Sequence, residues 1–585
     1  MDPVIIVGGG PVGLTTSLLL SDLGVPNVLF ERHQGTSIHP KAIGLNQRTI
    51  EIFRRLGLHK RIDAAAAPPS SVARTGWYTS LAGRSDLHGR QIAVRDAWGG
   101  GQYAEEYAAA SPAPYTMLPQ IRLEPILRAA AEARPNATVR FSTEVAAIEQ
   151  HETGVTVALA DGERVRGSYL VGADGGKMVA NALGIGFSGP TNLVDMVSAH
   201  FTADVTPLLP NRECLIYWFV NPDLGGSIGS GYLYHLGPWD EAGHSREWVF
   251  ACGFRPDDPE RFDEKAMKER ILRSLGVNRL EMDLHSVSHW YIQSVVADRY
   301  RGGRCFLVGD AAHRIPPWGA LGLNTGVQDA DNLAWKLAAT LRDPALSPLL
   351  DSYEDERRPI ATTVAANSLH NFQNHGDLID SAIGLDPSAP PSQGWDALRT
   401  LWSETPEGKS RRAALDEASR YMDHEFHAHG AENGFAYVRG ALAADPETST
   451  LPIDPVTYRP TSRPGHHLPH AWLDGPAGRV SSRDLPAPGR FTLYVDSVAA
   501  DGWRAALASI EHPLQPVVDV VEAGPTCAHE DSEGTWARLR EVTPSGAVLV
   551  RPDGIVAWRC HELPAQPEAS LTRAFDRILT IGEHL

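Results

Sequence analysis

The alternation of apolar and polar residues predicts a strand, a glycine turn and a helix at the start of the chain. Residues 4–7 are a short apolar run rich in β-branched side chains, and residues 14–23 continue as an apolar helical segment that stops at Gly24. A second apolar strand is expected at 27–32. A strand, a helix and a strand in this order are typical of a parallel sheet covered by helices, so we expect an α/β domain here.

Farther along, the period of the apolar residues switches between that of helices and that of strands. Helices are expected at 47–58, 121–133, 324–341 and 351–371. Period-two alternation predicts strands between 136 and 172 and a separate β-rich layer from about 185 to 295. A proline-rich stretch gives the strongest linker signal, with Pro446, Pro452, Pro455, Pro460, Pro464 and Pro469. Beyond it, strands are expected at 491–495, 516–521, 547–550 and 555–558.

The composition narrows the class of protein. With 53 Lys and Arg against 71 Asp and Glu, the net charge of −18 argues against binding to nucleic acid. The 585 residues allow roughly three to four domains. The 5 cysteines form no C-x-x-C pair, which argues against a disulfide framework or a thiolate zinc site. No apolar stretch approaches the ~20 residues that cross a bilayer, so we expect a cytoplasmic protein without a signal peptide or membrane span.

Three glycines lie at the turn between the first predicted strand and its helix. Gly8, Gly10 and Gly13 match the pattern G-x-G-x-x-G, in which backbone N–H groups and the helix dipole hold a pyrophosphate. Glu31 ends the second strand, where a carboxylate accepts hydrogen bonds from ribose hydroxyls. A tight turn and a solvated acid are the alternative interpretation, but strand, glycines and acid together favour a dinucleotide site.

Residues 305–325 indicate which dinucleotide binds. Asp310 follows a predicted buried strand, where its carboxylate can bind a ribityl hydroxyl. Residues 316–324 offer glycine-spaced amides at the start of a helix, and the positive end of the helix dipole suits the anionic edge of a reduced flavin. A domain that binds only NAD does not need this second motif, so the sequence predicts FAD.

With these motifs the sequence resembles the class A flavoprotein aromatic hydroxylases, which are single-component FAD monooxygenases. The resemblance extends over essentially the whole chain and includes residues 47–49, 119–125, 169–175, 309–310 and 353–359. It is closest to the long form, which is similar to dichlorophenol and phenol hydroxylases and to aklavinone-type polyketide hydroxylases.

The resemblance implies three domains. A discontinuous, Rossmann-like FAD-binding domain of α/β fold is expected at 1–75, 115–185 and 295–375, and a β-rich substrate domain at 76–114 and 186–294. A helical segment and linker would occupy 376–465. Residues 466–585 would form a thioredoxin-like domain without C-x-x-C, for which structural support or oligomer contact is the expected role.

The resemblance also assigns cofactor contacts. The ADP half of FAD would lie against Gly8, Gly10, Pro11, Val12, Gly13, Glu31 and Arg32, with Lys41 where the family usually has Arg. Gln120 and Asp310 would bind the ribityl side, and Asp174 would shape a loop that NADPH visits. The isoalloxazine would be lined by Pro317, Gly322, Leu323 and Asn324. Met178 and Asn181 stand where the family usually has Ser and Arg.

The activity that the resemblance implies is hydroxylation of a phenolic or hydroxy-heteroaromatic ring ortho to its hydroxyl. NADPH or NADH would reduce the flavin, and O2 would form a flavin C4a-hydroperoxide that oxidises a small aromatic substrate. The pocket would be lined by Ile43, Leu45, Trp218, Pro316, Trp318 and Gly319. Residues 42–46 hold neither Asp nor His, so the proton acceptor is sought among Tyr217, Tyr232, Tyr234 and His235. Packing on a half-buried sheet is the alternative for these four.

Other functions stay open at this point. A polyketide-tailoring hydroxylase or a Baeyer–Villiger oxygenase would act on a multi-ring substrate, and a flavin-binding sensor would bind FAD without substrate-stimulated NAD(P)H oxidation. The choice between NADPH and NADH and a possible homo-oligomer are also open.

Several polar residues have a functional and a structural interpretation. His313 lies within residues 305–325, called the flavin loop below, and could take a direct part in the chemistry. Zinc could be held by Asp423, His424, His427 and His429, but no second segment offers ligands, so we expect a polar helix end and no metal. The polar face of a helix near the pocket mouth is expected for His370, Asn371, Asn374 and His375.

Overall fold

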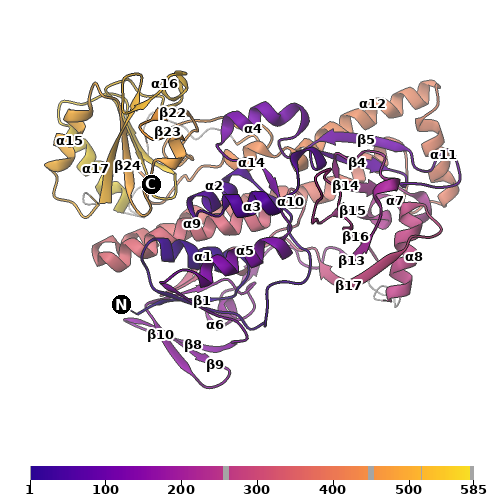
Figure 1. The fold of residues 1–585 in the computed structure, drawn as a ribbon, viewed down its shortest axis with the longest axis horizontal. Helices are drawn as coiled ribbons and strands as arrows, with labels where there is room; N and C mark the ends of the chain where they lie inside the picture. The colour runs from indigo at the N-terminus through magenta and orange to yellow at the C-terminus, as the bar shows by residue number, and fades with distance from the viewer. Residues whose placement is uncertain (1, 255–262, 444, 446–452, 515–516, 580–585) are drawn as a thin grey trace.

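The computed structural model describes residues 2–254, 263–443, 445, 453–514 and 517–579. Figure 1 shows the long helix α9 (Leu321–Arg342) between the C-terminal sheet and the N-terminal sheet, with a third sheet to the right of both. Pro446 and Pro452 of the predicted linker lie outside the described residues. Among the described helices, none is long and apolar enough to span a bilayer.

The first sheet is built from three distant parts of the chain. β1 (Val4–Val7) is paired in parallel with β2 (Asn27–Phe30) on one side and with β11 (Tyr169–Gly172) on the other. β7 (Ala137–Arg140) and β20 (Cys305–Leu307) extend the parallel order, and β19 (Arg301–Gly302) adds an antiparallel edge. β1 is buried along its whole length, because the first sheet is covered by α1 and by a small antiparallel sheet of β8 (Val145–His151), β9 (Gly154–Leu159) and β10 (Arg164–Gly167). The predicted α/β class with a discontinuous Rossmann-like domain is confirmed.

Helices pack on this sheet close to the predicted positions. They are α1 (Pro11–Asp22), α2 (Gln47–Arg55), α5 (Gln120–Glu132), α9 and α10 (Ser352–Ile383). The predicted end of α10 at residue 371 is wrong, because the buried stripe continues through Ile379 to Ile383. Gly384 then ends the helix with φ +81.

The third sheet is the β-rich layer. Its order is β17-β13-β16-β15-β14-β4-β5, and only β14 and β4 are paired in parallel. The strands are β4 (Arg74–Tyr78), β5 (Gln91–Asp96), β13 (Asp195–Ala203), β14 (Cys214–Phe219), β15 (Tyr232–His235), β16 (Glu247–Gly253) and β17 (Met282–Tyr291).

The two faces of this sheet are covered by different helices. Met267 and Ile271 of α8 (Glu264–Leu275) join Tyr217 in the core on one face. Ile379 of α10 joins Trp218 on the other face, together with residues of α11 (Pro391–Leu401) and α12 (Pro406–Tyr421). The face of Trp218 is therefore the one that looks toward α10 and the first domain.

The C-terminal sheet has the order β23-β22-β26-β25-β24-β27-β28. Its edge is formed by β22 (Trp472–Gly475), β23 (Gly478–Ser481) and β26 (His529–Glu530). Its central unit runs β24 (Phe491–Val495), α15 (Ala500–Ala508), β25 (Val518–Gly524), α16 (Thr535–Leu539), β27 (Ala547–Val550), β28 (Val556–Cys560) and α17 (Pro567–Leu579). β24 is parallel to β25 and antiparallel to β27. Residue 516, where a strand was expected to begin, lies outside the described residues. All five cysteines of the chain are free.

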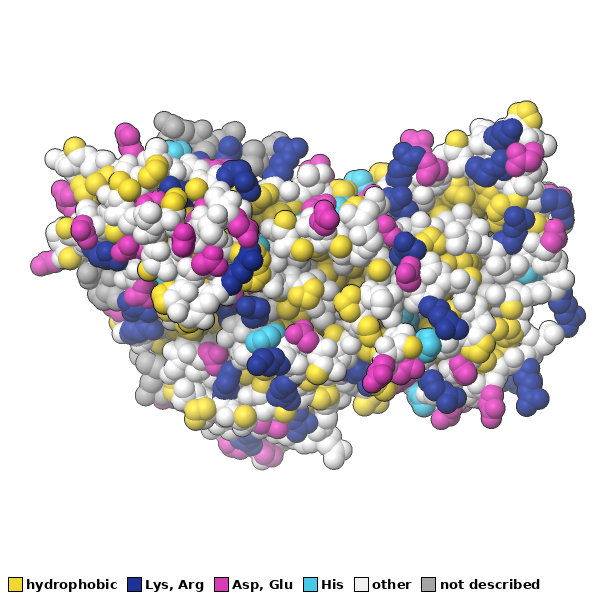
Figure 2. All heavy atoms as spheres, turned by 45° about the horizontal axis from the view of Figure 1, so that its top comes forward, with side chains coloured by type: hydrophobic (Ala, Val, Ile, Leu, Met, Phe, Trp, Pro, Cys, Tyr) yellow, Lys and Arg dark blue, Asp and Glu magenta, His cyan; other side chains and the backbone are white. Residues whose placement is uncertain are grey.

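The described charges are mixed on the surface. On the face shown in Figure 2, Lys and Arg side chains are interspersed with Asp and Glu. Salt bridges such as Arg479 to Glu533 and Arg140 to Glu163 pair exposed side chains of opposite sign. Such pairs contribute little to stability, so the fold depends on its cores and on the buried ion pairs described below.

Candidate active site

The turn between β1 and α1 leaves an open cradle. A Cβ on Gly8 would lie 2.3 Å from the carbonyl oxygen of Ala173, and a Cβ on Gly13 would lie 2.0 Å from that of Gly8. Both glycines are therefore required for the backbone to pack. A Cβ on Gly10 would meet nothing within 4 Å. This free space at the N-terminus of α1, where Pro11 takes the first helical position, suits a pyrophosphate held by backbone N–H groups.

Glu31 is placed beside this cradle at the end of β2. Its Oε2 accepts the N–H of Gly9 at 2.7 Å, and its Oε1 accepts the N–H of His33 at 2.8 Å. The carboxylate thus fixes the glycine turn, and its remaining lone pairs can accept hydrogen bonds from ribose hydroxyls. Arg32 and Lys41 are exposed.

The predicted ribityl side contains a linked amide and acid. Gln120 donates to Oε1 of Glu124 at 2.5 Å, and Oε2 of Glu124 accepts the N–H of Ser37 at 2.6 Å. Burial raises the pKa of Glu124, although nearby Lys41 works against this rise. Asp310 follows β20 and is exposed, so its carboxylate is free to meet a ligand.

Asp174 is used by its own loop. One carboxylate oxygen accepts the N–H of Gly176 at 3.1 Å, and the other accepts those of Met178 and Val179 at 2.6 and 3.0 Å. The side chain therefore fixes the loop that follows β11.

The N-terminus of α9 is shaped by two unusual residues. Gly319 has φ +102, and Ala320 before the helix has φ 55, in the left-handed region. The Asn324 side chain accepts the N–H of Asn46 and donates to the carbonyl of Gly44, both at 3.0 Å. Gly44 belongs to β3 (Gly44–Leu45), which pairs with β6 (Thr116–Met117). The first amides of α9, at residues 322–324, are thus presented beside β3, where the helix dipole suits the electronegative edge of a flavin.

A buried ion pair fixes the flavin loop from behind. Asp329 of α9 accepts the N–H of Gly309 at 3.1 Å and lies 2.8 Å from Nε2 of His313. Nε of Arg357 donates to the same carboxylate at 2.8 Å. Burial alone would raise the pKa of Asp329, but Arg357 and His313 hold it below its ordinary value. With Nε2 engaged in this way, His313 positions the loop.

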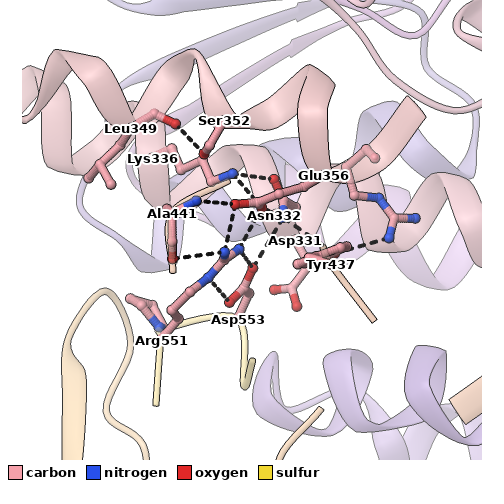
Figure 3. Close-up of polar contacts among 12 residues, drawn as sticks. Asp331, Asn332, Lys336, Leu349, Ser352, Glu356, Tyr437, Ala441, Arg551 and Asp553 are labelled. Carbon is pink, nitrogen blue, oxygen red and sulfur yellow. Dashed lines mark hydrogen bonds and ion pairs between the residues drawn. The ribbon is translucent and has the colours of Figure 1, made fainter. Parts of the chain in front are cut away.

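The C-terminal domain is tied to the same helices (Figure 3). Glu356 of α10 accepts hydrogen bonds from Lys336 of α9 at 2.7 Å and from Arg551 of the C-terminal domain at 2.7 and 2.8 Å. Asp553 pairs with Arg551 at 2.5 Å, and Asn332 of α9 reaches both acids. Burial lowers the pKa of Lys336 to about 8. The network therefore joins the consecutive helices α9 and α10 to a segment 195 residues farther along the chain.

The β-rich layer separates the four predicted proton acceptors. Tyr232 and Tyr234 lie on the face of Trp218, and the rings of Trp218 and Tyr232 are 4.5 Å apart. Tyr217 is on the opposite face with α8, where its hydroxyl donates to the carbonyl of Asn211 at 2.7 Å. His235 also faces away, because successive side chains of a strand point to opposite faces.

His235 is held as a structural residue. Its Nδ1 accepts the indole N–H of Trp239 at 2.7 Å. Burial lowers the pKa of His235 to about 4, so the ring is neutral near pH 7. The prediction that Tyr217 and His235 face the substrate is therefore corrected.

The predicted pocket residues are spread over several clusters. Trp318 packs 4.6 Å from the ring of Phe372 and shares a cluster with Met196 and Tyr232. Ile43 packs near Met117 in a second cluster. Leu45, by contrast, is 1% exposed in the core of the first domain. Pro316 and Gly319 are buried, and Pro317 is exposed.

Two polar residues near this face were not among the predicted catalytic candidates. Nδ1 of His375 in α10 lies 2.7 Å from Oε2 of Glu425, and the His375 ring is 4.0 Å from that of Trp218. His375 was expected on a polar helix face near the pocket mouth. Its four-residue spacing from Asn371 and Ile379, both buried, is the signal that could have indicated an inward position.

The histidines of the proposed zinc cluster are used in other ways. His427 and His429 stack on Tyr103 and Tyr107, with ring centroids 3.6 and 4.0 Å apart. Both histidines lie close to Glu106. Within the part of the chain that the structure describes, no group of three or more suitable side chains could hold a metal ion.

Comparison with known proteins places the chain in a family. A model of FAD-binding domains matches residues 1–368, and a model of the C-terminal domain of aromatic-ring hydroxylases matches residues 461–580. The chain belongs to the FAD-dependent aromatic-ring hydroxylases. It is 33% identical to a 2,4-dichlorophenol 6-monooxygenase from Delftia acidovorans, over 99% of this chain and 98% of the relative. It is also 33% identical to a tetracenomycin A2 monooxygenase-dioxygenase from Streptomyces glaucescens, over 99% and 96%.

Solved structures of this hydroxylase family are similar over the full length. The flavin-dependent monooxygenase PieE, in complex with FAD and substrate, has a TM-score of 0.89 at 37% identity and 99% coverage of both chains. Aklavinone-11 hydroxylase, in a ternary complex with FAD and aklavinone, has a TM-score of 0.79 at 29% identity and the same coverage. The protein is an FAD-dependent monooxygenase, and the glycine cradle and the α9 N-terminus fit that cofactor.

Proposed function

We propose that the protein hydroxylates a phenolic or hydroxy-heteroaromatic ring, ortho to its hydroxyl, with NAD(P)H and O2 as co-substrates. The carrying observation is the apolar cluster that contains Trp318 and against which Tyr232 packs. Trp318 lies two residues before Ala320, which precedes the α9 N-terminus, so the aromatic face of the β-rich layer meets the flavin loop. An aromatic ring bound here would lie between the cofactor side and the sheet.

Bound FAD would supply the activation of O2 and the transfer of one oxygen atom. Gly8, Gly10, Pro11, Val12, Gly13 and Glu31 would hold its ADP half, with Arg32 and Lys41 nearby. Gln120 and Asp310 would bind its ribityl side. The isoalloxazine would lie against Pro317, Gly322, Leu323 and Asn324, and Asp174 would shape the loop for NADPH.

The chain's own side chains would orient the substrate and keep water out. The rings of Trp218, Trp318 and Tyr232 supply a dry aromatic wall. Burial raises the pKa of Tyr232 and Tyr234 well above its ordinary value, so both hydroxyls stay protonated. They are therefore suited to donate a hydrogen bond to the substrate oxygen and not to remove its proton.

A multi-ring polyketide substrate is the second candidate. The observation that favours it is the full-length similarity to aklavinone-11 hydroxylase, solved with FAD and aklavinone, and to putative polyketide hydroxylases. A Baeyer–Villiger oxidation of such a substrate would insert oxygen into a ring beside a carbonyl, and its product would differ from a phenol.

The C-terminal domain is proposed to be thioredoxin-like and structural in role. The order β25-β24-β27-β28, with α15 and α16 between the strands, supports this fold. The absence of C-x-x-C from the sequence supports a role without redox chemistry. A cytoplasmic location and a homo-oligomer remain predictions.

The proposed function is tested by anaerobic stopped-flow reduction of the purified holoenzyme. NADPH and NADH are each mixed with enzyme alone, with simple phenols, with hydroxypyridines and with multi-ring phenols. We expect one substrate class to accelerate flavin reduction and to yield, in air, a product with one added oxygen atom. Flavin reduction that no aromatic substrate accelerates would contradict the proposal and favour a flavin-binding sensor.

A further inference from the structure

A histidine and a glutamate form a buried pair on the face of the β-rich layer that carries Tyr232. Nδ1 of His375, in α10, lies 2.7 Å from Oε2 of Glu425, in α13 (Asp423–Phe426). Their side chains are 6% and 5% exposed. Because an ionised carboxylate only accepts hydrogen bonds, Glu425 fixes the proton of a neutral His375 ring on Nδ1. The lone pair then lies on Nε2.

This second nitrogen has no partner among the described residues. Nε2 of His375 is buried without a hydrogen bond. The ring lies among aromatic side chains, with centroids 4.0 Å from Trp218, 5.7 Å from Trp77 and 6.1 Å from Phe426. A buried acceptor without a partner is costly, so a ligand group that completes its hydrogen bonding is expected here.

The pair lies close to the proposed substrate position. Tyr232, whose ring is 4.5 Å from Trp218, shares one cluster with Trp218 and a second with Trp318. The nearness of Glu425 adds to the effect of burial on the pKa of Tyr232, which is raised. His375, Glu425 and Tyr232 therefore lie together beside the aromatic wall, although they come from three different elements.

We propose that His375 is the base that accepts the proton of the substrate hydroxyl, and that Glu425 is the positioning residue that fixes its tautomer. The proposal rests on the hydroxylase function proposed above. The substrate O–H bond breaks, an N–H bond forms at Nε2 of His375, and the electron pair stays on the substrate oxygen. Nothing is oxidised or reduced in this step. The resulting phenolate is electron-rich at the ortho carbon that accepts oxygen.

The charges around His375 agree with this role. The titratable groups near it are Glu425 from α13, Tyr232 from β15 and Asp380 on its own helix. Burial raises the pKa of both carboxyl groups, and nearby His375 works against that rise. An ionised carboxylate beside the ring stabilises the positive charge that the proton transfer creates. Tyr232 stays protonated, so it can donate a hydrogen bond to the phenolate oxygen while His375 holds the proton.

The test compares His375→Asn with His370→Asn in the FAD-loaded, full-length enzyme. Asn at 375 can still donate to Glu425 from the position of Nδ1, but it lacks an acceptor at the position of Nε2. His370 is exposed on the same helix and is the matched control. The measured quantities are FAD content, NADPH oxidation without substrate, kcat for hydroxylated product and its pH dependence.

We expect H375N to retain FAD and to lose about 100-fold in kcat for product near pH 7. Its kcat should rise with pH toward the pKa of the substrate hydroxyl, and a nitro-substituted phenol of lower pKa should restore much of the rate. Glu425→Gln should lose about tenfold and shift the pH profile, because the tautomer is no longer fixed. H370N should match the unmodified enzyme.

Three results would overturn the assignment. The first is an H375N enzyme that has the same kcat and pH profile as the unmodified enzyme, when phenols stimulate NADPH oxidation by both enzymes. The second result does not depend on whether the variant folds. A nitrophenol bound to the unmodified holoenzyme should show the absorbance band of its phenolate at a pH below its solution pKa. A bound nitrophenol that is neutral at that pH would contradict the proposal. The third is the failure of every phenol to stimulate the unmodified enzyme, which would overturn the proposed function and this assignment with it.

Discussion

At the scale of single residues, the direction of a side chain from its strand decides which aromatic groups can meet a substrate. Tyr217 and Tyr232 lie on neighbouring strands, yet they face opposite sides of the same sheet. Tyr217 is buried and Tyr232 is half-buried. The Tyr217 hydroxyl is satisfied by the carbonyl of Asn211. Tyr232 packs against the cluster that contains Trp318 of the flavin loop.

We predict that Tyr232→Phe and Tyr217→Phe separate function from stability. Y232F should lower kcat/KM for the phenol about tenfold, because a hydrogen bond to a charged oxygen is worth roughly 1.5–3 kcal/mol. Y217F should change kcat/KM less than twofold and cost roughly 1 kcal/mol in the free energy of unfolding. Steady-state kinetics and urea unfolding measure both. Equal kinetic losses in the two variants would contradict the assignment of faces.

The sequence shows the alternation of this sheet but not which of its faces meets the cofactor. Period two places Tyr217 and Tyr232 on strands, and composition alone makes both attractive candidates. The choice between them depends on α8 covering one face and α10 the other, which is a tertiary contact between distant segments. The glycine motif, in contrast, could be predicted because its backbone requirement is local.

At the scale of elements, the proposed cofactor site would be built from backbone, by the β1–α1 turn and the N-terminus of α9. Gly8 and Gly13 are fixed by close backbone approaches, whereas a Cβ on Gly10 would enter open space. The functions of these glycines therefore differ. The first and third allow the fold, and the second leaves room for the ligand.

We predict that Gly10→Val folds but binds FAD poorly, while Gly13→Ala fails to fold stably. The φ of Gly10 is −75, which any residue adopts, so the cost of G10V falls on the ligand. A Cβ at residue 13 would lie 2.0 Å from the Gly8 carbonyl oxygen. FAD absorbance per protein and the far-UV thermal transition measure the two effects. A G10V protein with full FAD content would contradict this division.

Helix boundaries were harder to predict than helix existence. The pattern places α10 from 351 but ends it at 371, before the part that carries His375. Residues 371–383 include His375, Asp377 and Asp380 among the apolar residues, which weakens the hydrophobic periodicity. Their burial comes from packing against the β-rich layer and from partners such as Glu425 and Ser227, which local sequence does not reveal.

At the scale of the whole molecule, the C-terminal domain is joined to helices α9 and α10 by buried ion pairs. Arg551 and Glu356 are fully buried, and Lys336 completes the network from α9. Such a network specifies one docked arrangement, because each charge left unpaired away from water would be costly. The same helix, α9, presents its N-terminus to the cofactor.

We predict that Arg551→Met destabilises the protein by about 3–5 kcal/mol, because it leaves the buried Glu356 and Asp553 without their shared cation. FAD should also dissociate more readily, since α9 loses part of its support. Arg479→Met, which breaks an exposed pair with Glu533, is the matched control and should cost less than about 1 kcal/mol. Chemical unfolding and FAD retention on dilution measure the difference. An R551M protein as stable as R479M would contradict the docking role.

We also predict that stability falls as the pH drops below about 6.5. Burial lowers the pKa of His235 to about 4 and the pKa of His429 and His470 to about 3. In the unfolded chain the histidines titrate near 6.5. Between pH 6.5 and the lowered pKa values of the folded protein, the unfolded chain therefore binds more protons, and a fall in pH favours unfolding. Unfolding in urea at pH 8, 6.5 and 5 should give similar midpoints at the first two and a lower one at pH 5. A midpoint that rises at pH 5 would contradict the prediction.

The proposed reaction transfers oxygen to an aromatic ring at the junction of α9 and the β-rich layer. The most direct measurement is turnover of the FAD-loaded enzyme with NADPH, isotopically labelled O2 and the phenol that best accelerates flavin reduction. We predict that the hydroxylated product carries one labelled oxygen atom and forms in proportion to the NADPH consumed. Label found only in hydrogen peroxide or water, with the phenol unchanged, would contradict the account.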